Sequence, residues 1–343
     1  MSRVSVKFAV IGCGRISQNH FDAIKNAPHA ELVAVCDIDK AKAKAAAEEN
    51  GLEKWYTDIE EMLNCEKIDV CCVLTPSGMH CEHTCMVAAH KVNVLCEKPL
   101  DVTKAKMEKM INCCKDNNVK LGAIFQRRTY DGAIRTKEAI MNGDLGVVTL
   151  ADASLKYYRD QDYYDSGEWR ATWELDGGGA LMNQGIHGID MINWIMGGIK
   201  SVNAVCKTLA WDIEVEDTAV VTVKFNNGAI GVIQGSTAAY PGHDTIFSFH
   251  GTKGSISFGD DAFYCWEIAN PDKKKPELEG SMGGVNCQYS TTNFGHRYLV
   301  EDMALAVIDD REPMITGAEA KKSVDIILAI YESARLGKEI YID

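Results

Sequence analysis

Short apolar runs alternate with helical stretches through the first part of the chain. The runs are rich in Val, Ile and other residues typical of strands, and they lie at 6–12, 31–37, 68–75, 92–97 and 119–125. The helical patterns between them lie at 15–26, 40–50, 80–90 and 102–118. Strands and helices alternating at this spacing predict parallel strands with right-handed crossovers. We therefore expect residues 1–124 to form a doubly wound α/β domain of the Rossmann type.

The pattern changes after Phe125, where helical stretches at 131–142 and 179–196 precede a series of near-alternating strands. These strands lie at 201–210, 217–225, 228–237, 244–251 and 254–259. Alternating strands joined by tight turns predict a large, mostly antiparallel open sheet. Two helical stretches and a short strand follow, at 295–309, 317–336 and 339–342. We expect residues 125–343 to form an α+β domain for substrate binding and oligomerisation.

Composition excludes some classes of protein. The chain has 36 Lys and Arg against 49 Asp and Glu, a formal net charge of -13, so nucleic acid is not an expected partner. A strand pattern follows the first residues directly, and no apolar run is long enough to span a bilayer. We expect a cytoplasmic protein with no membrane partner, whose 13 cysteines are reduced thiols.

The segment MHCEHTCMVAAH contains residue types that bind zinc, namely His80, Cys81, His83 and Cys85. On a helix these side chains point around much of the circumference, although His80 or Cys81 can share a face with Cys85. We interpret the segment as a structural helix and expect no metal site, with zinc as the alternative.

The first strand leads directly into GCGRIS and then into a helix, which is the context that a dinucleotide-binding loop requires. Gly12 permits the tight turn, and Gly14 lets the backbone approach a pyrophosphate at the helix N-terminus. Ser17 replaces the usual third Gly or Ala, and it is still small enough for close packing of helix and strand. We expect Arg15 and Ile16 of this loop to contact the cofactor as well.

Asp37, at the end of the second strand, favours NAD over NADP. Its carboxylate can accept hydrogen bonds from the adenosine ribose diol and would repel a 2′-phosphate. The alternative role, capping the next helix, is one that Asp39 can fill. LTPSGMH follows another strand at the carboxyl edge of the sheet, so we expect cofactor contacts from Thr75, Pro76 and His80.

The next strand ends in LCEKPL, which places Glu97 and Lys98 at the same edge, near the expected nicotinamide. GCGRIS, TPSGMH and especially CEKP resemble the Gfo/Idh/MocA family of sugar and cyclitol oxidoreductases, and the similarity extends through GGGALMNQGIHGID to the C-terminal helices. The resemblance covers nearly the whole chain. It implies a Rossmann domain facing an open antiparallel sheet, with NAD(P) between them.

The resemblance implies that Lys98 and His187 are catalytic, because they match the lysine of EKP and the helix-borne histidine that touch the reacting hydroxyl. Glu97 and Lys98 are also expected cofactor contacts. By itself, a histidine on so apolar a helix would be interpreted as a core residue, but three glycines, Asn183 and Asp190 accompany this one. That company favours a functional role.

This chain departs from the family pattern before His187. Many members, inositol dehydrogenase among them, carry Asp four residues before the histidine and another three residues after it, whereas this chain has Asn183 and Asp190. On a helix the three side chains share a face, so we expect them to line one cleft and bind the substrate together with Lys98. Because Asn cannot take a proton, His187 is the favoured base and Lys98 is the alternative.

Four further residues occupy positions that contact cofactor or substrate in related proteins. Gln126, Trp169 and Arg170 are expected cofactor contacts, and Arg127 is an expected substrate contact. Surface or structural roles suit these residues equally well.

We therefore expect an NAD-dependent oxidoreductase that transfers hydride between nicotinamide and a secondary alcohol of a sugar, glycoside or sugar nucleotide. The likeness of the MNQGIHGID helix to that of some members suggests C3 of a pyranose. The alternatives are a reductase of an aldose or anhydro-sugar, a cyclitol dehydrogenase, and a non-catalytic NAD-binding sugar sensor. An exposed face of the open sheet would need covering, which predicts a homodimer or homotetramer.

Overall fold

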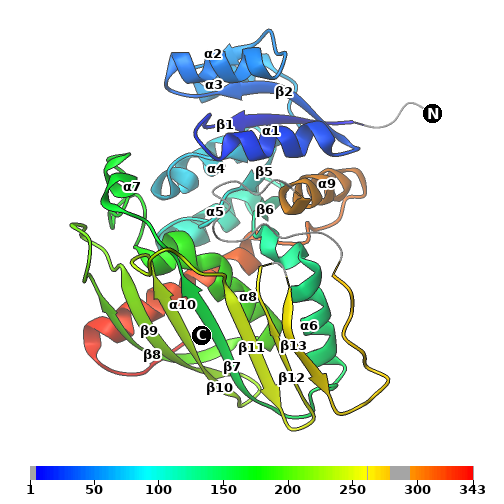
Figure 1. Cartoon of the computed structure of the whole chain (residues 1–343). Helices are drawn as coiled ribbons and strands as arrows, with labels where there is room; N and C mark the ends of the chain where they lie inside the picture. The colour runs from blue at the N-terminus through cyan, green and yellow to red at the C-terminus, as the bar shows by residue number, and fades with distance from the viewer. Residues whose placement is uncertain (1–4, 261, 279–293, 343) are drawn as a thin grey trace. The chain divides into compact units, whose positions relative to one another are not determined.

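The computed structural model describes residues 5–260, 262–278 and 294–342. They form two compact units. The first contains the described residues up to 126 and those of 293–321, and the second contains those of 127–292 and 322–343. Each unit is built around one sheet (Figure 1).

The first unit contains a six-stranded sheet. Its strands are β1 (Val6–Ile11), β2 (Ala30–Cys36), β3 (Trp55–Tyr56), β4 (Val70–Val73), β5 (Asn93–Cys96) and β6 (Leu121–Ala123). All are parallel, in the order β3-β2-β1-β4-β5-β6. This is the strand order of doubly wound dinucleotide-binding folds, so the expected Rossmann fold is confirmed. Winding reverses between β1 and β4, and such folds bind ligands at the carboxyl ends of the strands around that point.

Local sequence explains the elements of this unit. All residues of β4 are buried, as are Phe8 to Ile11 of β1, because their apolar side chains project on both faces of the sheet. The main helices between the strands are α1 (Ser17–Asn26), α2 (Lys40–Glu49), α3 (Ile59–Cys65), α4 (His80–Ala89) and α5 (Lys104–Asp116). Side chains of Asp39, Asp58 and Thr103 cap α2, α3 and α5 by accepting hydrogen bonds from first-turn N–H groups.

Helix α9 (Phe294–Ile308) belongs to the first unit although it lies far along the sequence. It packs against α1 (Figure 1), and Glu301 accepts a hydrogen bond of 3.0 Å from the N–H of His29. Its buried side chains include Leu299 and Met303. The division expected after residue 124 placed this helix in the second domain. The structure differs because the apolar side of α9 covers elements of the first unit.

Helix α10 (Gly317–Leu336) begins in the first unit and continues into the second. Among the helices of the described residues, none combines the length and the apolar character needed to cross a membrane.

The second unit contains an eight-stranded sheet. Its strands are β7 (Val148–Lys156), β8 (Ile199–Lys207), β9 (Thr218–Phe225), β10 (Ile230–Ser236), β11 (Ile246–Gly251), β12 (Gly254–Phe258), β13 (Phe263–Ile268) and β14 (Ile340–Tyr341). Their order is β13-β12-β11-β7-β10-β9-β8-β14, and the pairs are antiparallel except β7 with β10. The mostly antiparallel sheet is thus confirmed. Strand β7 differs from the sequence prediction, which placed no strand here. Two of its buried positions are alanines, Ala151 and Ala153, whose small side chains give only a weak hydrophobic alternation.

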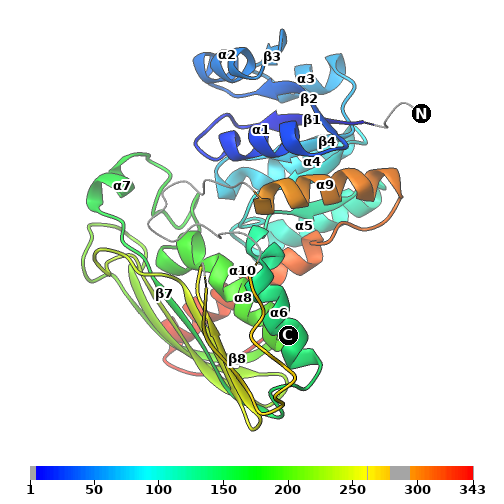
Figure 2. The same ribbon diagram turned by 45° about the vertical axis from the view of Figure 1, so that its right-hand side comes forward.

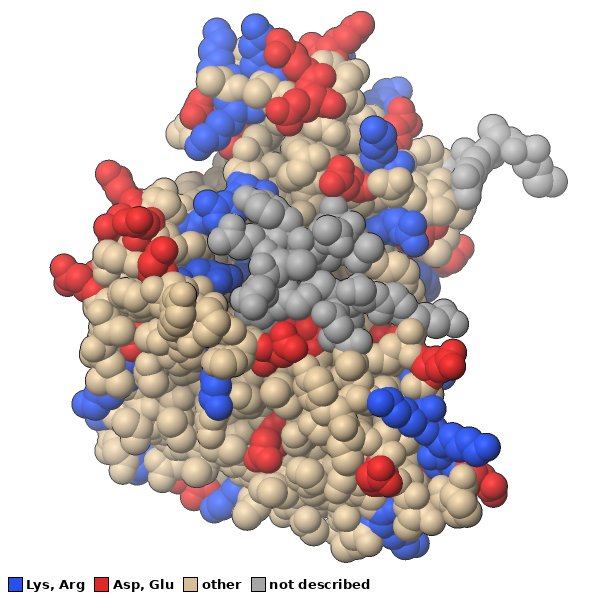
Figure 3. Space-filling view, in the orientation of Figure 1, with Lys and Arg blue, Asp and Glu red and all other residues tan. Residues whose placement is uncertain are grey.

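One face of this sheet carries helices, among them α6 (Asp131–Met141) and α8 (Ile186–Met196), as Figure 2 shows. No helix of the described residues covers the opposite face (Figure 2). On it Val205 is 61% exposed, Val220 is 50% exposed and Ile230 is 58% exposed. Figure 3 shows few charged side chains over these strands. This face combines these apolar side chains with charged ones, among them Lys207 and Lys224, and exposed apolar side chains grouped in this way can mark an interaction surface.

Candidate functional site

Two glycines shape the loop after β1. Gly12 has a φ of +96°, and a Cβ on it would lie 2.8 Å from the carbonyl oxygen of Leu74, so the turn requires glycine. Gly14 is exposed, and a Cβ on it would meet nothing within 4 Å, which leaves its backbone open to a ligand. Arg15 is exposed and Ile16 is partly exposed. The loop adjoins the N-terminus of α1 and has the form expected of a pyrophosphate site.

Asp37 directly follows β2, and main-chain groups hold its carboxylate. Oδ2 accepts a hydrogen bond of 2.7 Å from the N–H of Cys13 in the glycine loop, and Oδ1 accepts one of 2.8 Å from the N–H of Asp39. Asp39 itself caps α2, so that role does not fall to Asp37. The partly exposed carboxylate therefore stays beside the loop, where doubly wound folds bind the ribose diol.

His80 ties together the two loops that follow β4 and β5. Its Nδ1 lies 2.8 Å from the carbonyl oxygen of Pro99, and its Nε2 lies 2.8 Å from that of Thr75. The residue is 1% exposed, so it braces the loops and does not present a nitrogen to a cofactor as expected. Nδ1 of His83 lies 2.9 Å from the Thr75 hydroxyl. Among the described residues, this segment does not gather a metal-ligating cluster. Thr75 and Pro76 remain partly exposed at the edge.

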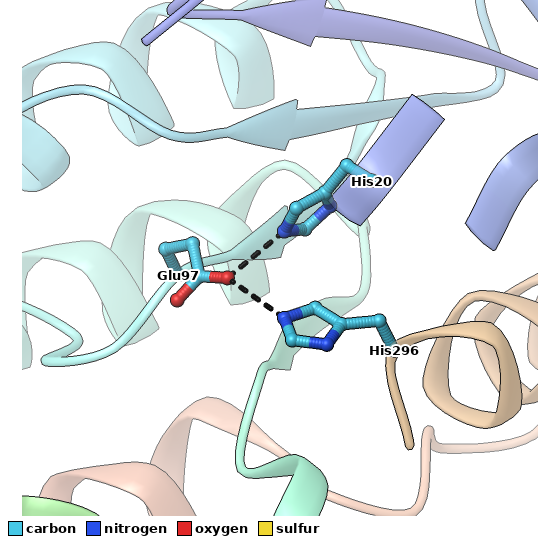
Figure 4. Close-up of side chains that lie close together, drawn as sticks. All are labelled: His20, Glu97 and His296. Carbon is cyan, nitrogen blue, oxygen red and sulfur yellow. Dashed lines mark hydrogen bonds and ion pairs between the residues drawn. The ribbon is translucent and has the colours of Figure 1, made fainter. Parts of the chain in front are cut away.

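Glu97 and Lys98 follow β5 at the same edge of the sheet. Lys98 is partly exposed, whereas Glu97 is 6% exposed and its side chain points toward His20 and His296 (Figure 4). The N–H of Lys98 donates a hydrogen bond of 3.0 Å to Oε2 of Glu97. Glu97 thus supports the backbone of Lys98, and its carboxylate is not directed to a cofactor as the sequence suggested.

In the second unit, His187 lies near the junction of two helical segments of different pitch. The segment η3 (Ala180–Gly185) is a π-helix, and α8 continues directly from it. Gly179 precedes η3, and the carbonyl oxygen of Glu216 occupies the place that a Cβ on this residue would need. The sequence predicted one regular α-helix here. A π-helical segment rotates the side chains that precede it relative to an α-helix, and such segments are frequent at functional sites.

Asn183 and His187 are both partly exposed on these segments. Nδ2 of Asn183 donates a hydrogen bond of 2.6 Å to Oδ1 of Asp176, which is 3% exposed. Oδ1 of Asn183 accepts one of 3.2 Å from Nε2 of Gln184. The amide of Asn183 is therefore oriented at both ends. Sequence reasoning missed Asp176, and the available signal was an acidic residue directly before the three glycines.

Two neighbouring arginines are engaged by different carboxylates. Nη1 of Arg127 lies 3.3 Å from Oδ1 of Asp260. Arg128 donates hydrogen bonds of 2.8 and 2.6 Å from Nε and Nη2 to the two oxygens of Asp190. Asp190 is 1% exposed and also accepts a hydrogen bond of 2.7 Å from Ser323. The expected cleft shared by Asn183, His187 and Asp190 is therefore not formed, because Asp190 points into the protein and anchors α8.

An aromatic and cationic arm precedes the glycine run. The hydroxyl of Tyr163 accepts hydrogen bonds of 2.7 Å from Arg170 and 3.0 Å from Gln184. The guanidinium of Arg170 lies 4.4 Å from the ring centre of Tyr163 and 4.5 Å from that of Trp169. Nη2 of Arg159 donates a hydrogen bond of 3.2 Å to Oε1 of Gln184. The arm thus connects aromatic rings and guanidinium groups to the amides beside His187.

The predicted residues form one group in each unit. The sheet edge of the first unit carries Gly12, Gly14, Asp37, Thr75, Pro76 and Lys98, with Gln126 as the partly exposed last residue of that unit. The second unit carries Asn183, His187, Trp169 and Arg170.

Two known domain families match the chain. Residues 6–125 match the oxidoreductase family with an NAD-binding Rossmann fold, and residues 134–257 match the GFO/IDH/MocA C-terminal domain. Myo-inositol 2-dehydrogenase of Thermotoga maritima is 32% identical over 338 residues, which cover 93% of this chain and 96% of the relative. The chain belongs to the Gfo/Idh/MocA family. The resemblance found in the sequence motifs is thereby confirmed, and this family member contains an NAD-binding Rossmann domain.

Other Gfo/Idh/MocA relatives are also named as sugar-related enzymes. D-glucoside 3-dehydrogenase of Escherichia coli K12 is 31% identical over 247 residues, which cover 67% of this chain and 70% of the relative. The crystal structure of the WlbA dehydrogenase from Bordetella pertussis, in complex with NADH and UDP-GlcNAcA, has a TM-score of 0.89 and 31% identity. That match covers 99% of each chain.

Proposed function

We propose that this protein is an NAD-dependent dehydrogenase that transfers hydride between nicotinamide and a secondary alcohol of a sugar-type substrate. The position of Lys98 in the first unit carries the proposal. This residue follows β5, which pairs with β4, at the sheet edge that also carries the glycine loop and Asp37. A dinucleotide with its pyrophosphate on that loop reaches across this edge. We therefore assign the amine of Lys98 to the reacting oxygen.

Lys98 and His187 share two tasks, namely removing the hydroxyl proton and stabilising the negative charge that forms on the oxygen. In the oxidative direction, NAD bound at the glycine loop would supply the hydride acceptor, and the hydroxyl proton must pass to a base. We assign His187 as that base, because a neutral imidazole accepts a proton near neutral pH. Lys98 hydrogen-bonds the same oxygen and stabilises its alkoxide character. Asn183, oriented by Asp176, binds a neighbouring hydroxyl.

We propose the C3 hydroxyl of a pyranose, within a glycoside or a sugar nucleotide, as the reacting group. The names of the Escherichia coli and Bordetella pertussis relatives support this choice. The arm supports it chemically, since the rings of Tyr163 and Trp169 suit the C–H face of a sugar and the amides of Asn183 and Gln184 suit its hydroxyls. A cyclitol dehydrogenase is the second candidate, because the Thermotoga maritima relative acts on myo-inositol.

The open face of the second sheet is the surface through which we propose that the protein forms a homodimer or homotetramer. Val205 and Val220 are paired on adjacent strands of this face, and Ile230 is paired with Leu150. The two pairs lie apart on the same face, with Thr222 and Val232 between them, and association would remove their apolar side chains from water. Light scattering after size-exclusion chromatography should give a multiple of the chain mass, and Val220→Lys should lower it.

A substrate screen tests the proposed reaction. Glycosides, UDP-linked sugars, free sugars and inositols are incubated with NAD, and the absorbance of NADH is recorded, with Lys98→Met as the matched inactive variant. Oxidation of glycosides or UDP-sugars to 3-keto products supports the proposal. If only inositols are oxidised, the result supports the second candidate, a cyclitol dehydrogenase. Tight NAD binding without turnover of any polyol would contradict both.

A further inference from the structure

Three side chains from distant parts of the sequence meet at the end of β5, inside the first unit (Figure 4). His20 comes from α1, Glu97 follows β5, and His296 comes from α9. Nε2 of His20 lies 2.9 Å from Oε1 of Glu97, and Nε2 of His296 lies 3.5 Å from the same oxygen. His20 has no exposed surface, and the other two are 6% exposed. The function proposed above does not use this cluster.

The hydrogen-bond donors around Glu97 define its charge state. Both imidazoles direct Nε2 at Oε1, and a neutral imidazole protonated at Nε2 supplies an N–H there. Oε2 accepts the N–H of Lys98. Burial by itself would raise the pKa of Glu97, but the hydrogen bonds from His20 and His296 outweigh it and hold this pKa well below the ordinary value. Burial lowers the pKa of His20, more than Glu97 raises it. Glu97 is therefore a carboxylate beside a neutral His20.

Two ionisable groups near Glu97, among the described residues, are uncharged. They are the buried thiols of Cys72 on β4 and Cys96 on β5, and burial first, then the charge of Glu97, raises the pKa of each. The carboxylate is thus a buried negative charge, and Lys98, which directly follows Glu97, donates its N–H to it. A buried anion of this kind favours the ammonium form of an adjacent lysine.

We propose that His20 and His296 are positioning residues, which hold Glu97 as a buried carboxylate so that it fixes both the backbone and the charge state of Lys98. The inference rests on the proposed function for the catalytic role of Lys98. His296 lies on α9 and supplies one of the hydrogen-bond donors to Glu97, so α9 acts on the reaction through Lys98. His20 likewise connects the helix that follows the glycine loop with Lys98, because it lies on α1.

Two histidines and a carboxylate are also ligands for a divalent metal. The 2.9 Å separation of His20 and Glu97 is that of a hydrogen bond, which accounts for the contact without an ion. Substitution at His296 separates the two interpretations. Gln places an amide N–H close to where imidazole Nε2 lies, whereas Asn is one methylene shorter and its N–H does not reach Glu97. Neither amide replaces a histidine as a good ligand for zinc or iron.

The experiment compares wild type, His296→Gln and His296→Asn as full-length protein, after circular dichroism and thermal unfolding have shown that each is folded. Reductive methylation of Lys98, measured by peptide mass spectrometry across a pH series, reports the charge state of its amine without any substrate. We expect His296→Gln to match wild type. In His296→Asn the midpoint of Lys98 modification should move to lower pH, as it should in Glu97→Gln. With a substrate that the wild-type protein oxidises, kcat of His296→Asn should fall by about ten- to a hundredfold while NAD affinity changes little.

A second measurement needs no variant. Nitrogen-15 shifts of the imidazoles in the wild-type protein should show His20 and His296 protonated at Nε2 and not at Nδ1. The proposal is overturned if either ring carries its proton at Nδ1, or if the Lys98 midpoint is the same in wild type and His296→Asn. Bound stoichiometric metal, lost equally in the Gln and Asn variants, would replace it with a metal site. If no sugar or cyclitol is oxidised, the proposed function fails, while the Lys98 midpoints and the imidazole shifts still decide this inference.

Discussion

The side-chain amide of Asn183 donates a hydrogen bond of 2.6 Å to the buried carboxylate of Asp176, whose other oxygen accepts the N–H of Ala171 at 2.9 Å. Many Gfo/Idh/MocA members carry Asp where this chain has Asn183. The acidic group here lies instead at Asp176, behind the amide, and each oxygen of its carboxylate has an N–H donor. This arrangement orients the amide of Asn183 through a buried carboxylate.

Exchange of these two residues tests the pairing. Asp176→Asn should lower the free energy of unfolding by about 1–3 kcal/mol, because one carboxylate oxygen becomes an amide group that faces an N–H donor. Asn183→Asp should also be destabilising, since it brings two carboxylates together. The double exchange restores one donor and one acceptor, so it should recover most of the loss. Urea unfolding gives the free energy of unfolding of the wild type, the two single variants and the double variant. A loss in the double variant equal to the sum of the two single losses would contradict the pairing.

The carboxylate of Asp37 should determine the choice of cofactor. The main-chain N–H groups of Cys13 and Asp39 hold it beside the glycine loop, where it would repel a 2′-phosphate. We expect kcat/KM with NAD to exceed that with NADP by about tenfold or more, the effect of about 1.4 kcal/mol. Asp37→Ser should narrow the ratio. Equal use of both cofactors by the wild-type protein would refute this role.

The two loop glycines should respond differently to alanine. A Cβ on Gly14 meets no atom within 4 Å, so Gly14→Ala should fold normally and bind NAD more weakly, because the methyl group projects where a pyrophosphate approaches. A Cβ on Gly12 would lie 2.8 Å from a carbonyl oxygen, so Gly12→Ala should lower the unfolding temperature as well. Thermal unfolding and titration with NAD distinguish the two effects. Unchanged NAD affinity in Gly14→Ala would place the pyrophosphate elsewhere.

The assignment of the base predicts a pH profile. His187→Ala should lower kcat by about 10²- to 10⁴-fold and leave NAD affinity nearly unchanged, as expected when a general base is removed. The wild-type rate of oxidation should rise through one ionisation near neutral pH, and the variant should lack it. If the variant keeps that ionisation and most of the rate, Lys98 is the base and His187 binds the substrate.

Buried Glu216 should make stability depend on pH. Its carboxylate accepts hydrogen bonds from the N–H groups of Gly179 and Leu181 and from the hydroxyl of Tyr331. Burial, partly offset by these bonds, raises the pKa of Glu216 from 4.5 to about 7. The native state therefore binds more protons than the unfolded chain between those two values. The contribution of protonated Glu216 to the free energy of unfolding is complete below the unfolded-chain pKa of 4.5. It is lost, by up to about 3 kcal/mol, as pH rises through the native pKa of about 7.

Urea unfolding at about pH 5 and about pH 8 should accordingly show a less stable protein at the higher pH. Glu216→Gln has no charge at either pH and should lose this difference. The exposed Glu48→Gln serves as the control and should keep it. If Glu216→Gln also keeps the full difference, other groups cause the dependence.

Local sequence determined much of the first unit. The apolar runs of β1 and β4 predicted buried parallel strands, and the turn at Gly12 requires glycine through its own backbone conformation. Asp37 is held by Cys13 and Asp39, both of which belong to the motifs that surround it. These features depend on residues close along the chain or on strand order, which the alternation of strands and helices restricts strongly.

The tertiary structure alone decided which side chains meet across long stretches of sequence. The amphipathic pattern of α9 indicates a buried side but not what it covers, so the pattern did not reveal that His296 reaches Glu97. Asp190 lies on the helix that carries His187, yet Arg128 draws it into the protein, because a buried carboxylate requires a partner that periodicity does not specify. Helical spacing likewise could not predict that η3 is a π-helix, since its pitch depends on how the segment packs against the rest of the unit.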